Sequence, residues 1–519
     1  MSILDWINFG KVSAERDDLL QHYFFDNGVL KGAIDSPSTF LFLGRKGAGK
    51  TAVFKHLCER RDAFIGKECL LIPLSFEDYN WNIHALLMDE GRAESLAYKQ
   101  SWRFVILTEC IRAFVENFEA HGRRVPKPIA ASKTLLEKLF ESPIPSIGRL
   151  VGEKLLSLSS VSLPKGGVGL EDGDLESLTV DGGGVAFEQV KADKSLQRKL
   201  SENIGQVLTL LEASISSSLD DLPRIFICFD KVDEAWDDVS FEDSKRVIAG
   251  LVAAGDSIAS AYGGAIRPLI FLREDIFDVL SINDANKLRE DCGTLLHWTR
   301  ASLAKMLLHR VNYFGQIAGV EEVSDIDALF DKKELRQRNR PLNHLIKRTM
   351  MRPRDLIAFC GRIVQNMKEK ADDPFSDDPV AFELIETSSV YESEPGYSEW
   401  LEQEVLDEWA VQRPEIRDLF NALRNNSSTN FSKADLSREL DSLGLAPDQA
   451  AVDSYLRFLF DISVIGFKLG QASEWKFKCF YPSQGFVASD EYRVHEGLVR
   501  ALNLTETRDR SGSTSADAS

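Results

Sequence analysis

Apolar runs alternate with amphipathic segments over roughly the first 300 residues of the chain. The runs at 39–43, 68–76, 225–230, 266–275 and 293–298 are short and apolar on both faces. Strands of this kind are typical of a parallel sheet, because helices cover both of its sides. Apolar residues recur at spacings of three and four in the segments between the runs, which predicts helices. The pattern therefore predicts an α/β core.

The chain between the first and third of these strands is longer than a strand–helix–strand unit requires. Helical periodicity covers 94–118 and 194–215, whereas 146–190 is rich in glycine, serine and acidic residues. We expect an insertion over about 80–218, with helices at its two ends and loops or a small hairpin between them. The insertion carries no catalytic motif.

The second half of the chain is predicted to be mainly helical. Amphipathic helices are expected at 300–317 and from Pro353 onward, since proline is favoured in the first turn of a helix. A segment rich in Pro and Asp, 371–395, is expected to link domains. Three helical segments and an alternating run at 474–482 then predict a winged helix.

The segment GRKGAGKT, at 44–51, joins the first strand to a helical pattern and matches GxxxxGK[ST]. Glycine tolerates the positive φ angles that turn backbone N–H groups toward a phosphate. Lys50 is expected to reach the β- and γ-phosphates, and the Thr51 hydroxyl to bind Mg²⁺. The candidate nucleotide-binding residues are Gly44, Arg45, Lys46, Gly47, Ala48, Gly49, Lys50, Thr51 and Ala52. Arg45 and Lys46 are weaker candidates, because a charged side chain in a loop is more often exposed to solvent than bound to a ligand.

The run IFICFD, at 225–230, would end at the same edge of the sheet as the glycine loop. Ligands bind at the carboxyl ends of strands in such sheets, so Asp230 is the candidate carboxylate for Mg²⁺. Arg273 ends the next strand and would either sense the γ-phosphate or form an ion pair with Glu274 or Asp275. Arg354 lies near a helix N-terminus, where a cation needs an anionic neighbour. That neighbour would be a nucleotide phosphate reached from a helical lid, or an acidic side chain.

Composition narrows the function classes. The net charge is −19, which argues against a surface that binds nucleic acid or membranes throughout. Seven cysteines are scattered without CxxC spacing, as in a reduced cytosolic protein. No apolar stretch predicts a signal peptide or a membrane span, so we expect a cytoplasmic protein without a membrane partner.

Several segments together resemble bacterial P-loop ATPases of the STAND/AAA+ type, of about 500 residues and often encoded near phage-defence genes. The resemblance spans about 10–504. It is carried by HYFFDNG, GRKGAGKTA, FDKVDEAW, IFLRED, RPRDLI and YSEWLEQEVLDEW, and by the expected winged helix. It implies an ASCE-type core with the P-loop strand between the acidic and sensor strands, ATP and Mg²⁺ as ligands, and a nucleotide-gated switch that oligomerises. By position it also implies Arg273 as sensor and Arg354 as lid arginine.

The sequence departs from many AAA+ proteins directly after Asp230, where Lys231 replaces the usual catalytic glutamate. STAND-like relatives tend to have Asp-x-x-Asp-Glu there, which fits DKVDE. If the strand continued by one residue, Lys231 would point away from the crevice. Asp233 or Glu234 would then orient the attacking water, and hydrolysis would be slow.

The expected domains are a helical leader at 1–30, the P-loop core at 31–300, a helical lid and linker at 301–400, the winged helix at 401–503 and a disordered tail at 504–519. The leading hypothesis is an ATP-hydrolysing switch that controls assembly or a partner effector encoded nearby, in antiphage defence. A DNA-binding ATPase that uses the winged helix, and a scaffold that binds ATP without hydrolysing it, are the alternatives. The balanced charge of the winged helix gives nucleic acid weak support.

Overall fold

The computed structural model describes residues 2–76, 84, 98–140, 161–162, 179–180, 194–234, 241–372, 382–445, 448–469 and 474–506. They fall into two units, Asp26–His297 on one side and Met1–Phe25 with Trp298–Ser519 on the other. Most of the glycine- and serine-rich insertion, and the tail from 507 onward, lie outside the described residues.

A parallel sheet forms the centre of the unit Asp26–His297. Its strands, in spatial order, are β2 (Leu70–Ser75), β5 (Ile225–Asp230), β6 (Ile266–Arg273), β1 (Leu41–Gly44) and β7 (Gly293–Leu295). All five apolar runs are thus strands, and the predicted α/β class is confirmed.

The expected strand order is wrong in one respect. The P-loop strand β1 pairs with β6 and β7, and the acidic strand β5 pairs with β2 and β6. The sensor strand β6 therefore lies between the P-loop strand and the acidic strand. Local apolar patterns show that a segment is a strand, but they do not encode which neighbour it pairs with, since this depends on the crossover through α13 (Phe241–Ala261).

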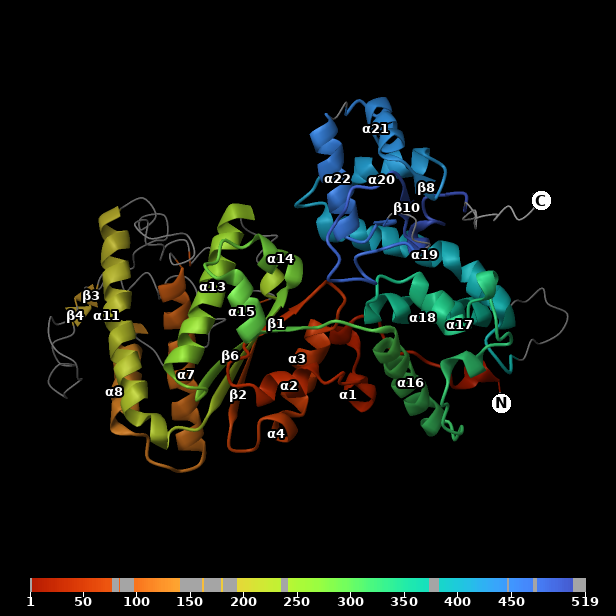
Figure 1. Ribbon diagram of the computed structural model, residues 1–519. Coiled ribbons are helices and arrows are strands. Elements are labelled where there is room, and N and C mark those ends of the chain that lie inside the picture. Colours follow the sequence, from red (N-terminus) through yellow and green to blue (C-terminus); the bar gives the residue numbers. More distant parts are fainter. Residues whose placement is uncertain are drawn as a thin grey trace, which may run out of the picture. The chain divides into compact units, whose positions relative to one another are not determined.

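Helices cover both faces of this sheet (Figure 1). On one face the core includes Leu41, Leu43 and Ile227, together with side chains of α7 (Lys99–Ala120), α8 (Lys127–Phe140), α11 (Lys194–Ser218) and α13. On the other face Phe42 stacks on Phe271, and Phe54 of α3 (Lys50–Glu59) meets Phe271 edge-on. Alternate side chains of β1 thus pack against the helices on opposite faces of the sheet.

A buried arginine anchors the chain just before the P-loop strand. Arg267 of β6 donates to the carbonyl oxygens of Ile34 (2.7 Å), Ala33 (3.0 Å), Ser36 (2.6 Å) and Thr39 (3.1 Å). Burial lowers the pKa of its guanidinium to about 10, which leaves it charged at neutral pH. These bonds satisfy the last carbonyls of α2 (Val29–Asp35) and hold the entry to β1.

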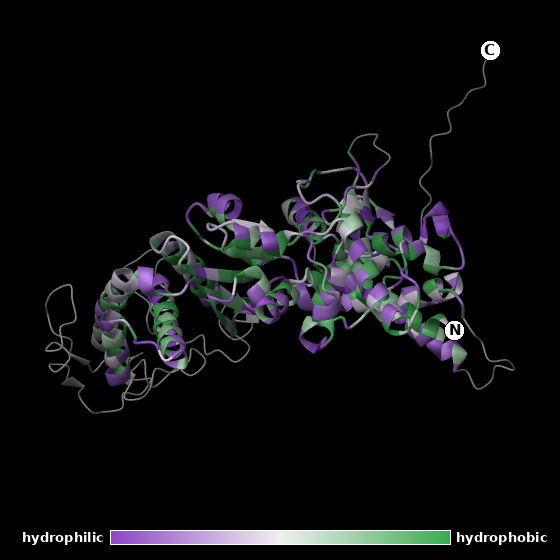
Figure 2. Ribbon diagram, turned by 90° about the horizontal axis from the view of Figure 1, so that it is seen from below, coloured by the Kyte–Doolittle hydropathy of each residue, from purple (hydrophilic) through white to green (hydrophobic). Residues whose placement is uncertain are grey.

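The second unit combines the first residues of the chain with its C-terminal half. Over the described residues 2–25, the chain forms the short helices η1 (Ile3–Asp5), η2 (Ala14–Arg16) and α1 (Leu20–Tyr23). Their apolar residues share a core with α16 (Arg300–Ile317), α17 (Pro341–Lys347), α18 (Pro353–Ala371) and α19 (Thr387–Trp409). In Figure 2 several helices are purple along one side and green along the other, as expected for amphipathic helices.

The expected linker at 371–395 is partly helical instead. Helix α19 begins at Thr387 and continues through Pro395. A proline inside a helix costs about 3 kcal/mol. Burial of Val390, Tyr397 and Leu401 on one face of α19 offsets this cost, because each fully buried apolar side chain contributes about 1.5–3 kcal/mol. Residues 373–381 of the expected linker lie outside the described part.

The C-terminal helices α20 (Ile416–Asn425), α21 (Lys433–Ser442) and α22 (Gln449–Asp461) are joined by an antiparallel sheet in the order β8 (Asn430–Phe431), β10 (Tyr492–Val494), β9 (Ile465–Phe467). This is a winged-helix arrangement. The alternating run at 474–482 is not a strand, however. Lys476 forms an isolated bridge to Phe467, and the chain then turns as the N–H groups of Phe480 and Tyr481 bond to the Phe477 carbonyl. The wing strand is β10 instead.

Within the described residues, none of the helices combines the length and the apolar character needed to cross a membrane.

Candidate functional site

The glycine loop connects β1 to α3 in the conformation that its sequence predicts. Gly47 and Gly49 have φ angles of 79° and 100°, which other residues rarely adopt. Gly44 needs its lack of a side chain for a different reason. A Cβ atom there would lie 3.1 Å from Cβ of Leu296 and 3.3 Å from Cβ of Ala48. The loop can therefore turn its N–H groups inward beneath the N-terminus of α3.

Lys50 folds its side chain back across the loop. Its Nζ donates to the carbonyl oxygens of Gly44 (3.1 Å) and Arg45 (3.4 Å). Burial lowers the pKa of this ammonium, and among the carboxylates that oppose this shift Asp233 has the largest effect. The ammonium thus lies in the loop without full solvation, where an anion would stabilise it.

Asp230 lies at the end of β5, facing the first turn of α3. Its side chain is buried, and Thr51 Oγ1 is 3.5 Å from Asp230 Oδ1. Burial and, to a lesser degree, the charge of Asp233 raise the pKa of Asp230 to about 6. Hydrogen bonds from the Lys231 N–H and the Thr51 hydroxyl, and the charge of Lys50, oppose this rise. A hydroxyl and a carboxylate oxygen are ligands that suit Mg²⁺, so these two residues fit the cation predicted from the sequence.

The acidic stretch after Asp230 turns away from the strand direction. Lys231 has a φ of 58°, so β5 does not continue and the expected strand alternation does not apply to it. The chain enters the short helix η6 (Val232–Glu234), in which Asp233 is half-buried. The Asp233 charge raises the pKa values of both Lys50 and Asp230. Asp233 is therefore brought to the loop, while the side chain of Glu234 lies outside the described residues.

Arg273 ends β6, between the strands that carry the loop and Asp230. It is 8% exposed, and its guanidinium donates to both carboxylate oxygens of Asp275, Nε to Oδ1 at 3.2 Å and Nη2 to Oδ2 at 2.7 Å. Its charge also lowers the pKa of Lys50. The ion-pair alternative is thus confirmed, and the charge of Arg273 also acts on the glycine loop through Lys50, while sensing of a γ-phosphate stays a prediction.

Arg354 belongs to the other unit, and acidic side chains of α19 supply anionic neighbours there. Its Nη1 lies 3.1 Å from Glu404 Oε2. Arg352 is held by Asp355 at 3.0 Å and by Glu408 at 3.1 Å. The ion-pair alternative therefore accounts for both arginines, and a contact of Arg354 with nucleotide stays a prediction.

Asp275 was not singled out as a site residue, although it organises this edge of the sheet. It pairs with Arg273 and also opposes the lowering of the Lys50 pKa. The sequence signal was its position two residues after the strand end, which also fits an ordinary acidic first turn of a helix.

The raised pKa of Asp230 predicts a pH dependence. Between the unfolded value of 3.8 and about 6, the folded state without nucleotide binds more protons than the unfolded state. We therefore expect its stability to rise as the pH falls from 7 to 5, by about 1 kcal/mol from this group. Asp230→Asn should remove this increment while raising stability at pH 7, as measured by urea unfolding at several pH values. An unchanged pH dependence in the variant would contradict the assignment.

Comparison with known proteins gives partial likenesses. A family profile described as the FunZ-associated C-terminal helical domain matches residues 301–405. A putative transposon gamma-delta 80.3 kDa protein of Escherichia coli K12 is 23% identical over 96% of this chain and 67% of its own length.

Two solved structures align with most of the chain. Cdc6p from Pyrobaculum aerophilum shares 12% identity over 93% of this chain and 91% of its own, with a TM-score of 0.29. The Orc1 protein of Aeropyrum pernix, solved in complex with DNA, shares 11% over 95% and 96%, with a TM-score of 0.37. These scores are too low to support detailed comparison. The sheet order, the glycine loop and the acidic strand end give the unit Asp26–His297 the α/β P-loop NTPase fold, and a C-terminal helical domain follows it.

Proposed function

We propose that this protein binds Mg²⁺-ATP at the glycine loop and hydrolyses it slowly as a molecular switch. The observation that supports this most directly is the convergence of Lys50, Asp230, Asp233 and Arg273 at the carboxyl ends of three adjacent strands. Phosphoryl transfer needs little more than positioning and charge stabilisation of this kind. When bound, Mg²⁺ would neutralise developing charge on the phosphates, held by Thr51 and Asp230.

The slow rate is inferred from the turn after Asp230. Lys231 stands where many AAA+ ATPases have their catalytic glutamate, and its positive φ takes the chain out of the strand. Asp233 reaches the loop from a short helix instead, and we assign it the role of orienting water. A protein of this kind would act as a timer, in which the bound nucleotide persists long enough to report a state.

We further infer a STAND/AAA+-type switch that assembles or signals to a separate effector, in antiphage defence and in the cytoplasm. Support comes from the sequence resemblance, and from the absence of a nuclease, protease, deaminase or TIR-like motif in the sequence. The effector would be another chain. Adenine is preferred because no NKxD-type guanine-reading motif is present.

The winged helix is better suited to contact protein than duplex DNA. Its third helix, α22, carries Arg457 as its only lysine or arginine, and this guanidinium lies 5.8 Å from the Phe486 ring. Asp453 of the same helix pairs with Lys433. A helix that reads the major groove usually carries a basic surface, so DNA binding remains the alternative.

One experiment tests the switch. ATP turnover and particle mass should be measured together on the full chain, with ATP, with ADP and with a duplex DNA. We expect turnover well below the ~10 s⁻¹ typical of enzymes and a mass that differs between ATP and ADP. If the protein does not hydrolyse ATP and its particle mass does not change when ATP is added, the switch is refuted. Binding without turnover would favour the scaffold, and stimulation by DNA would favour the DNA-binding ATPase.

A further inference from the structure

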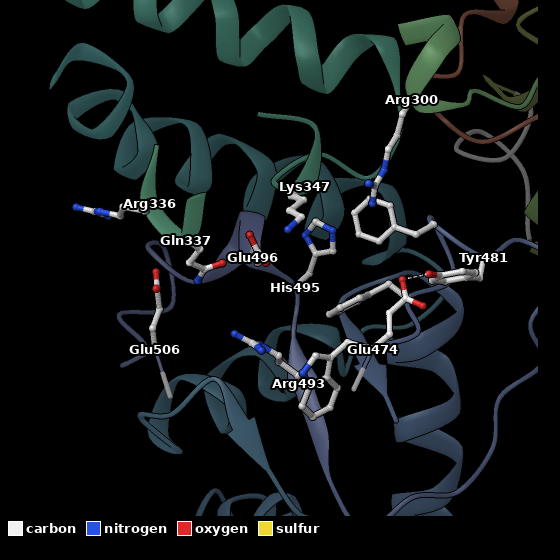
Figure 3. A pocket seen from close by; sticks show the side chains of 13 residues that line it. Arg300, Arg336, Gln337, Lys347, Glu474, Tyr481, Arg493, His495, Glu496 and Glu506 are labelled. Atoms are coloured by element: carbon white, nitrogen blue, oxygen red, sulfur yellow. Dashed lines mark hydrogen bonds between the residues drawn. The ribbon is translucent and has the colours of Figure 1, made fainter. Parts of the chain in front are cut away.

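A cavity of about 790 Å³ lies in the second unit, between the helical segment that contains α16 and α17 and the winged helix. Arg300 and Lys347 line it from the ends of α16 and α17, and Arg493 lines it from the wing strand β10. Figure 3 shows these side chains around the space, with His495 and Glu496 beside Lys347. The cavity is thus built from parts of the chain that are up to about 200 residues apart, and several positively charged side chains line it.

Two of these cations have only neutral hydrogen-bond partners. Arg300 Nη1 donates to Asn343 Oδ1 at 3.3 Å, and Lys347 Nζ donates to Asn339 Oδ1 at 2.9 Å. In the described part of the chain neither residue takes part in a salt bridge. A further cation of the wall, Arg336, lies 3.8 Å from Glu394. Neither charge is therefore fixed in an ion pair within the described residues, and both can meet an anion in the cavity, Arg300 in competition with Glu474, whose pKa its charge helps to lower.

The carboxylates of the wall are paired with cations that do not line it. Glu474 lies 2.8 Å from Lys476, and Tyr481 also donates to it. Glu496 lies 3.4 Å from Arg348 Nη1. These pairs neutralise part of the negative charge, so the cavity as a whole favours an anionic ligand.

Trp475 lines the cavity with its half-buried ring. Its Nε1 is buried, yet among the described residues it has no hydrogen-bond partner. Lys468 and Arg493 lie over the ring, at 4.5 and 5.6 Å from its centroid. The two cations lie close to the aromatic part of the wall.

Another part of the wall is aromatic, formed by Phe477, Phe480 and Tyr481, while Gln337 and Glu506 also line the cavity. A single inorganic phosphate would leave most of about 790 Å³ empty, whereas a ligand with a planar apolar part would use this wall. We propose that the cavity binds a nucleotide through its phosphate, as a free molecule or as the end of an oligonucleotide. The site is separate from the P-loop, and its ligand would contact both the helical segment and the winged helix.

Calorimetry on the full-length chain tests this site. The Lys50→Ala protein removes the P-loop contribution, and the probes are AMP, GMP, pyrophosphate and a 5′-phosphorylated pentathymidylate. We expect one equivalent of a mononucleotide or of the oligonucleotide to bind, more tightly than pyrophosphate. Binding of the mononucleotide identifies a free nucleotide as the source of the phosphate, and binding of the oligonucleotide alone identifies nucleic acid.

Substitutions in the wall assign the binding to this cavity. Lys347→Met and Arg493→Gln should each weaken it by about 10- to 100-fold, because each removes a charged donor. Arg438→Gln, on the exposed face of α21, is the control and should change nothing.

Three outcomes would overturn the proposal. They are the absence of nucleotide and oligonucleotide binding at about 1 mM, binding that is insensitive to Lys347 and Arg493, and pyrophosphate binding as tight as that of nucleotides. Binding that depends on Lys50 but not on the wall residues belongs to the P-loop, so failure here is distinguishable from failure of the ATP site.

Discussion

Lys50→Ala is expected to weaken ATP binding by about 100-fold or more, because it removes a charged donor from a loop that otherwise offers backbone N–H groups. Equilibrium binding of a fluorescent ATP analogue measures the loss. In the free protein, the Lys50 ammonium bonds only to the carbonyl oxygens of its own loop, according to the hydrogen bonds of the described residues. Its main function would therefore be exerted when a nucleotide is present.

The same substitution should not destabilise the free protein. Burial lowers the pKa of Lys50, so its charged form is less favourable in the folded state than in the unfolded one. Removing the ammonium should leave the melting temperature at pH 7 unchanged or higher. Lys67→Ala, an exposed lysine before β2, is the matched control and should affect neither property. Full ATP binding by Lys50→Ala would place the nucleotide site elsewhere.

Asp233→Asn is expected to retain ATP binding but to slow hydrolysis by about 100- to 1,000-fold, the usual contribution of a group that orients or activates water. Among the described side chains, the charge of Asp233 acts on both Lys50 and Asp230. The side chain of Glu234, the other acid that the sequence left open, lies outside the described residues. Single-turnover hydrolysis of radiolabelled ATP, with filter retention of the bound nucleotide, separates the chemical step from binding.

One control variant and one pH effect make this assignment specific. Glu242→Gln, an exposed acid at the start of α13, should hydrolyse ATP at the unmodified rate. Asp233 is the carboxylate that most strongly favours the charged form of Lys50, so Asp233→Asn should lower the pKa of Lys50 further. As the pH is raised above 7, ATP binding by the variant should therefore begin to weaken at a lower pH than ATP binding by the unmodified protein. If Glu234→Gln traps ATP while Asp233→Asn does not, the role moves to Glu234.

The local motifs of the candidate nucleotide site could be predicted because their chemistry depends on adjacent residues. The turn at Gly47 and Gly49 requires positive φ, and Lys50 and Thr51 follow it directly on a helix. The strand ending at Asp230 is visible as an apolar run that stops at a carboxylate. Such features need only a few consecutive residues, and the structure has them at the predicted positions.

Other features could not be predicted locally. The linker prediction failed where α19 passes through Pro395, because tertiary burial outweighs the local cost of a proline. The prediction of a strand at 474–482 is wrong. Phe477 and Cys479 are buried in the core of the winged helix, and the chain turns at Phe477 to place them there. In both cases, contacts with residues distant in the sequence decide the conformation.

The sequence by itself determined the strand–loop–helix of the phosphate site, the apolar strands of an α/β core and the carboxylate at the end of β5. Only the tertiary structure decided that β6 lies between β5 and β1, which sets Arg273 between Asp230 and the loop. It also decided that Asp233 acts on Lys50, and that Arg300, Lys347 and Arg493 surround one cavity. The physical reason is that charge interactions and cavities depend on distances in space, whereas backbone geometry and apolar periodicity act over a few neighbouring residues.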